Sequence, residues 1–156
     1  MNVEDVRAHL NDLIGVSRDG EEGYRHAAAH VSNSELRSLF EASARQRAGF
    51  VRELQQELER LGGATTDTGT FAGAVNRGWL DVKSAITGGS AGAVVGACET
   101  GDDSAAAAYE RFVNTDISGQ TRTLVEKQWH AIVEAHRHLI KLKEEIATGS
   151  RYADNL

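Results

Sequence analysis

Proline is absent from all 156 residues of the chain. Proline is the residue that interrupts a helix most strongly, because it lacks a backbone N–H and its ring clashes with the preceding turn. Alanine, leucine, glutamate and arginine, which are good helix formers, are plentiful. We therefore take a helical chain as the default, and the spacing of the apolar residues predicts where each helix begins and ends.

Two long segments in the first part of the chain place apolar and small residues at a three-four spacing, which is typical of one face of an amphipathic helix. The first covers about residues 3–31 and the second about residues 33–61. We expect Ser32 to cap the second helix, with Glu35 as its capping-box partner, and Gly62 to follow it in a left-handed conformation. The turn between the two helices is short, so they should form an antiparallel hairpin.

The second part of the chain predicts another hairpin, with helices over about 91–114 and 117–147 and with Asp116 as the cap between them. Residues 62–90 are too many for a structureless loop in a compact domain, so we expect a partly helical crossover. Four large side chains should fix it to the bundle: Phe71, Trp79, Leu80 and Ile86. Two hairpins joined by one long connection predict an all-α, ferritin-like four-helix bundle, a single domain over residues 1–156.

Composition excludes several classes of function. The chain carries 17 basic and 23 acidic residues, for a net charge of −6, which argues against nucleic acid as a partner. No run of about 18 apolar residues could span a membrane, and the N-terminus lacks the pattern of a secretory signal, so we expect a cytoplasmic protein. The lone Cys98 rules out an intramolecular disulfide and should be buried in the core. Association through outer helix faces predicts a homo-oligomer, and we expect a homodimer.

Asp102 falls on the apolar stripe of the third helix, where an unpaired buried carboxylate would cost several kcal/mol. Glu99 lies one turn earlier beside the same stripe. Glu21 and Glu53 border the stripes of the first two helices, and His136 borders that of the fourth. Oxygen ligands with few imidazoles suit iron or manganese, so these residues are a candidate metal site. Counting from the first turn, however, places Glu21 and Glu53 about 13 Å apart along the bundle.

A second interpretation of the same acids needs no metal. Arg47 lies on the apolar stripe of the second helix, so a buried ion pair with it could compensate Asp102. Other polar side chains could hold the remaining acids: Tyr24, Arg45, Tyr109 and Gln128. Under this interpretation the protein is a non-enzymatic bundle that acts through assembly or partner binding.

Several stretches together resemble a bacterial family of unknown function, described as a four-helix-bundle protein and placed in the ferritin-like superfamily. They are Asp19-Gly20-Glu21-Glu22-Gly23-Tyr24, Glu53-Leu54, Arg77-Gly78-Trp79, Cys98-Glu99 with Gly101-Asp102-Asp103, Tyr109 and His136. The resemblance covers roughly residues 4–145.

In metal-binding members of that superfamily, helices two and four each supply Glu-x-x-His and the other two supply carboxylates. The resemblance therefore implies Glu21, Glu53, Glu99 and Asp102 as carboxylate ligands and His136 as the last histidine. The sequence departs from this pattern at Gln56, three residues after Glu53, and at Val133, three residues before His136. Two functions remain open: a bundle that works through assembly or partners, with a stress-related role, and an abridged iron or manganese site with oxidation-related activity.

Overall fold

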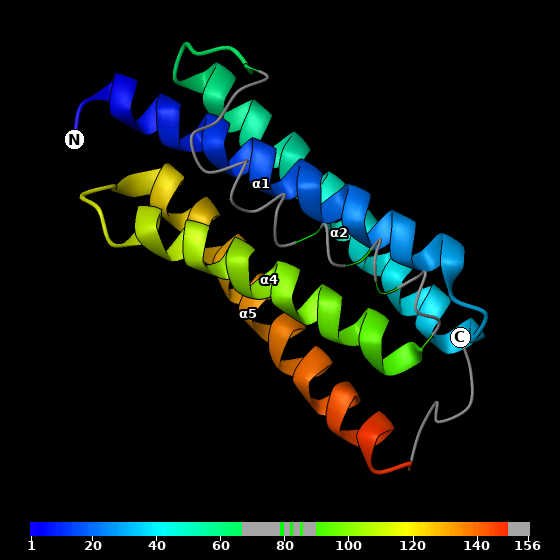
Figure 1. The fold of residues 1–156 in the computed structure, drawn as a ribbon. Coiled ribbons are helices and arrows are strands. Elements are labelled where there is room, and N and C mark those ends of the chain that lie inside the picture. Colours follow the sequence, from blue (N-terminus) through cyan, green and yellow to red (C-terminus); the bar gives the residue numbers. More distant parts are fainter. Residues whose placement is uncertain (67–78, 80–81, 83–84, 86–89, 150–156) are drawn as a thin grey trace.

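Four long helices account for most of the computed structural model, which describes residues 1–66, 79, 82, 85 and 90–149. They are α1 (Val3–His30), α2 (Ser34–Arg60), α4 (Ala91–Val113) and α5 (Gly119–Ala147). Their ends lie within two residues of those expected from the apolar spacing. No strand occurs among the described residues, and the all-α four-helix bundle is confirmed (Figure 1).

Helices α1 and α2 form an antiparallel hairpin (Figure 1). The side chain of Arg7, near the start of α1, donates from Nε to the carbonyl oxygen of Leu61 over 2.7 Å, just past the end of α2. Farther along the hairpin, Gly20 lies against Arg47. Residue numbers thus rise along one helix as they fall along the other, as the short turn predicts.

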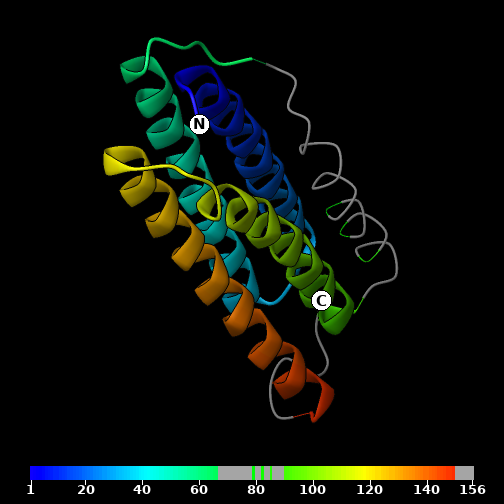
Figure 2. The same ribbon diagram turned by 90° about the vertical axis from the view of Figure 1, so that its left-hand side faces the viewer.

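The second hairpin, α4 with α5, packs so that α4 runs antiparallel to α1. Ser17 of α1 meets Tyr109 of α4, and Tyr24 of α1 meets Asp102 of α4. Since α2 is also antiparallel to α1, α2 and α4 run in the same direction. The turn between α4 and α5 therefore lies at the end of the bundle where the chain begins (Figure 2). The end of α2 and the start of α4 therefore lie at opposite ends of the bundle.

The core is a continuous cluster of apolar side chains drawn from all four helices. Its largest fully buried apolar members include Phe40, Tyr24, Tyr109 and Phe112. Trp79 and Val82, from the segment that joins the hairpins, are also buried in it, and Trp79, Val82 and Ala85 have helical conformation. Trp79 therefore holds the connection as expected, whereas Phe71, Leu80 and Ile86 lie outside the described residues. No helix in the described part of the chain is long and apolar enough to cross a membrane.

Two of the predicted helix caps are wrong. The N-cap of α2 is Asn33, whose side-chain oxygen accepts from the backbone N–H groups of Glu35 and Leu36 at 3.0 Å. Ser32 lies one residue too early for this role. The N-cap of α5 is Ser118 in place of Asp116, and α5 begins two residues later than expected. Gly62 has the predicted positive φ, 78°, the left-handed conformation that commonly ends a helix, and it directly follows the C-cap of α2.

Candidate functional site

The centre of the bundle holds a fully buried ion pair. Nη1 of Arg47, from α2, lies 2.7 Å from Oδ1 of Asp102, from α4, and the two side chains are 1% and 0% exposed. Burial alone would lower the pKa of Arg47, but the adjacent carboxylate more than offsets this and raises that pKa above its usual value. The guanidinium is thus a permanent cation, and it compensates the charge of Asp102.

Tyr24 completes the coordination of the same carboxylate by donating its hydroxyl to Oδ2 of Asp102. Burial, together with the negative charge of Asp102, raises the pKa of Tyr24 well above its usual value, so the phenol keeps the proton that it donates. The guanidinium carbon of Arg47 also lies 5.3 Å from the centre of the Tyr24 ring. Both oxygens of Asp102 are therefore engaged by protein groups.

A second buried polar chain lies nearer the start of α1. Ser17 and Tyr109 have their hydroxyl oxygens 3.0 Å apart, and Tyr109 donates to Oε1 of Gln128 over 2.7 Å. The amide of Gln128 in turn donates to Oε1 of Glu53 over 3.2 Å and to the carbonyl oxygen of Phe50 over 3.4 Å. This chain joins all four helices, and its groups satisfy one another in place of solvent.

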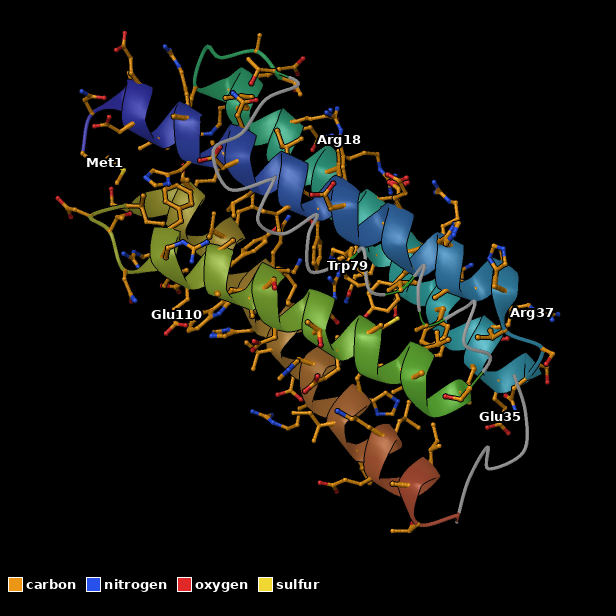
Figure 3. All side chains as sticks on the ribbon, in the orientation of Figure 1. Met1, Arg18, Glu35, Arg37, Trp79 and Glu110 are labelled. Atoms are coloured by element: carbon orange, nitrogen blue, oxygen red, sulfur yellow. The ribbon has the colours of Figure 1, made fainter. Side chains whose placement is uncertain are left out.

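The side chain of Trp79 covers the buried group around Asp102 on the side of α1 and α4, and Figure 3 shows it between the two helices. Two glycines make room for its ring. A Cβ atom added to Gly23 of α1 would lie 2.2 Å from Cε3 of the indole, and one added to Gly101 of α4 would lie 2.4 Å from Cε2. The ring also packs edge-on against Tyr24, with centroids 4.9 Å apart. The indole therefore covers the aromatic partner of Asp102.

Glu99 and His136, two of the five predicted ligands, lie close together and nearer the surface than Asp102. Nε2 of His136, from α5, lies 3.5 Å from Oε1 of Glu99 and 3.8 Å from Oδ1 of Asp103, both from α4. The side chains of Glu99 and His136 are each 22% exposed. This is a histidine between two carboxylates at the α4–α5 seam.

The other predicted ligands have separate partners. Glu21 pairs with Arg25 on the outside of α1, with Oε2 and Nη2 2.7 Å apart. Because Gly20 lies against Arg47, Glu21 is level with the middle of α2 and not with Glu53. Within the described part of the chain, no group of three or more histidine, cysteine or acidic side chains is arranged to hold a metal ion. The five predicted ligands therefore do not converge on one point.

Of the polar partners proposed for the acids, Arg47 and Tyr24 hold Asp102, and Gln128 holds Glu53. Arg45 instead lines a groove on the outside of the first hairpin. Cys98 is buried, as expected, and burial beside Asp102 raises the pKa of its thiol well above the usual value. The thiol therefore stays protonated and unreactive.

Asp103, Ser17 and Asp19 are among the polar positions whose roles sequence reasoning did not anticipate. Asp103 faces His136, and Ser17 extends the Tyr109 chain. Asp19 is half-buried, and burial with the nearby charge of Glu22 raises its pKa to about 6. Ser17 falls on the apolar stripe of the first helix, which was a usable signal. Asp103 and Asp19 lie beside the stripes, so only the packing of the neighbouring helices reveals them.

A sequence model of one protein family, described as a domain of unknown function (DUF2383), matches residues 5–115 of the chain. This match extends from the first turn of α1 to the turn after α4, so it includes Tyr24, Arg47, Trp79 and Asp102. A search of curated proteins found no match.

Proposed function

The chain belongs to the DUF2383 family, whose function is unknown, and we propose from its own residues that it is a non-enzymatic, ferritin-like bundle that acts by assembly or by binding a partner. The observation that carries this proposal is the Arg47–Asp102 ion pair. Asp102 is the most buried acid of the interior, and its two oxygens are taken by Arg47 and Tyr24.

Metal-based oxygen chemistry requires carboxylates that are free to coordinate and a coordination position open to substrate. A guanidinium at 2.7 Å occupies the place that a cation would take beside Asp102. Replacing it by a metal would leave Arg47 as an uncompensated buried charge, which is strongly unfavourable. The interior is therefore suited to fixing the positions of the helices, and recognition is left to the outer faces.

The connectivity supports the ferritin-like assignment. Parallel α2 and α4 joined by one long connection are the arrangement of ferritin-like bundles, whereas up-down-up-down bundles use short loops throughout. A lone buried Cys98 suits a reducing bacterial cytoplasm, and a stress-related role is compatible with a scaffold of this kind. We expect the assembled form to be a homodimer.

The alternative function, iron or manganese binding with oxidation-related activity, is favoured by one observation. Glu99 and Asp103 both approach His136, within 3.5 and 3.8 Å. Glu99 and His136 belong to the predicted ligand set, and Asp103, which was not predicted, adds a second carboxylate beside the histidine.

Anaerobic calorimetric titration with Fe(II) and Mn(II) measures metal binding, and a separate aerobic assay measures oxidation of Fe(II) by O2. Sedimentation velocity on the same protein measures assembly. We expect no stoichiometric metal binding and no Fe(II) oxidation, together with a defined oligomer. Glu99→Gln should then match Glu110→Gln, an exposed position on the same helix. Stoichiometric metal binding that is lost in Glu99→Gln and kept in Glu110→Gln would establish the alternative. A strictly monomeric protein that turns over Fe(II) would overturn the proposal entirely.

A further inference from the structure

A groove of about 390 Å³ lies between α1 and α2, on the outside of the first hairpin. It is close to the turn that joins the two helices, the end of the bundle where Figure 3 labels Arg37. Exposed charged side chains form its rim, and small side chains form its floor. We call it the arginine groove, and its lining consists of Arg25, Ala28, Ala29, Arg37, Glu41, Ala44 and Arg45.

The groove concentrates positive charge in an acidic protein. Three arginines and a single glutamate line it, although the chain as a whole has a net charge of −6. Arg37, Glu41 and Arg45 follow each other at four-residue intervals, so they project from one face of α2. Such a local excess of one charge attracts groups of the opposite charge.

Two of the arginines are not used in ion pairs. Among the ion pairs of the described residues, none includes Arg37 or Arg45. Arg37 donates from Nη2 to the carbonyl oxygen of Val31 over 3.0 Å, which fixes the guanidinium at the mouth of the turn. Arg25 pairs with Glu21 on its own helix, and its side chain is 67% exposed. The guanidinium groups of the rim therefore have few existing hydrogen bonds or ion pairs to break before a ligand binds.

The chemistry of the lining favours carboxylates over phosphates. A guanidinium is a planar fork that binds a carboxylate through two parallel hydrogen bonds. Glu41 stands between Arg37 and Arg45, and its negative charge repels a dianionic phosphate more strongly than a singly charged carboxylate. Ala28 and Ala44 are buried in the floor and give an apolar surface on which an aliphatic side-chain stem can lie.

We propose that the arginine groove binds a carboxylate-rich segment of a partner protein. This rests on the proposed function, because it names the class of partner that the bundle would recognise. Arg25 from α1 and Arg45 from α2 hold acidic side chains from opposite walls, and Arg37 holds a third near the turn. The bundle core keeps α1 and α2 at a fixed separation, so the walls are in place before the ligand arrives.

The test uses the full chain and a decaglutamate peptide as the probe, with binding followed by ¹H–¹⁵N correlation spectra at low salt. Shifts should be concentrated in the α1–α2 hairpin, around Ala28 and Ala44. Replacing all three arginines by glutamine should weaken binding roughly tenfold. The matched control changes charge equally at exposed positions on the other hairpin, Arg111→Gln, Arg137→Gln and Lys141→Gln, and should weaken it much less.

Four further outcomes are decisive. The double variant Arg25→Lys with Arg45→Lys keeps both positive charges but loses the guanidinium groups. Weaker binding in this variant therefore supports bidentate hydrogen bonding of carboxylates by the arginines. Shifts spread over both hairpins, or equal losses in the glutamine variant and the control, would overturn the proposed groove. A dimer in sedimentation that the glutamine variant abolishes would also overturn it, because a second copy would then occupy the groove. Each of these results leaves the metal titration, and hence the proposed function, as a separate question.

Discussion

Replacing Asp102 by asparagine should destabilise the bundle severely, although the two side chains have nearly the same shape. The change removes the only carboxylate that is paired with Arg47 among the described residues, and Arg47 is 1% exposed. A buried charge left without its partner costs about 3–5 kcal/mol. A domain of this size has a free energy of unfolding of only about 5–15 kcal/mol, so a large part of its stability should be lost.

Replacing both members of the ion pair should behave differently from replacing Asp102 alone. Arg47→Met together with Asp102→Leu replaces the ion pair by apolar groups of similar volume, and such replacements are neutral or stabilising by about 1–4 kcal/mol in other proteins. The double variant should thus be far more stable than either Arg47→Met or Asp102→Leu alone, and the wild type with these three variants forms a double-mutant cycle. Equilibrium urea unfolding, followed by circular dichroism, measures all four free energies of unfolding.

The reasoning would be refuted by additive losses in this cycle. If the double variant loses as much as its two single variants combined, Arg47 and Asp102 do not compensate each other. A loss below about 1 kcal/mol in Asp102→Asn would likewise show that the guanidinium reaches solvent or another anion, because an exposed ion pair is worth about that much. Tyr24→Phe is the milder control, since it removes one hydrogen bond and leaves the charges paired.

Three further predictions concern packing, capping and pH. Gly101→Ala should destabilise the protein by about 1–3 kcal/mol in urea unfolding, because the new Cβ would lie 2.4 Å from the ring of Trp79; a neutral effect would mean that the indole moves freely. Asn33→Ala should cost about 1 kcal/mol through loss of the α2 cap, whereas Ser32→Ala should change the melting temperature little. Asp19 binds its proton more tightly in the folded state, with a pKa of about 6 against 3.8, so its contribution to stability falls as pH rises through that interval. Asp19→Asn should therefore raise the melting temperature at pH values above that interval and have little effect below it; an equal effect at both would contradict the raised pKa.

The helices could be predicted from the sequence because their signal is repeated many times. The apolar spacing recurs over every turn of α1, α2, α4 and α5, so an error at one position changes little. Caps depend on a single residue each, and Asn33 beside Ser32 offers two side chains of similar capping ability. The backbone conformation of the turn decides between them, and that conformation depends on how the two helices pack.

The interior could be predicted only in part. Asp102 and Arg47 stand out because charged residues on an apolar stripe require compensation, and the structure pairs them. The predicted grouping with Glu21 and Glu53 depended on the register between helices, which the sequence leaves open to within a turn or more. Trp79 illustrates the same limit, since its contacts with Gly23 and Gly101 join three segments that are distant in the chain. Glycines inside helices indicate a close approach, but they do not name the approaching residue.

Metal content tests the central claim, that Arg47 and not a metal ion compensates the buried acid, most directly. Protein purified without chelators should be analysed for iron and manganese by elemental analysis, as the wild type and as Asp102→Asn. The account predicts far less than one metal ion per chain in both. One or more metal ions per wild-type chain, lost when Asp102 is changed to asparagine, would contradict it.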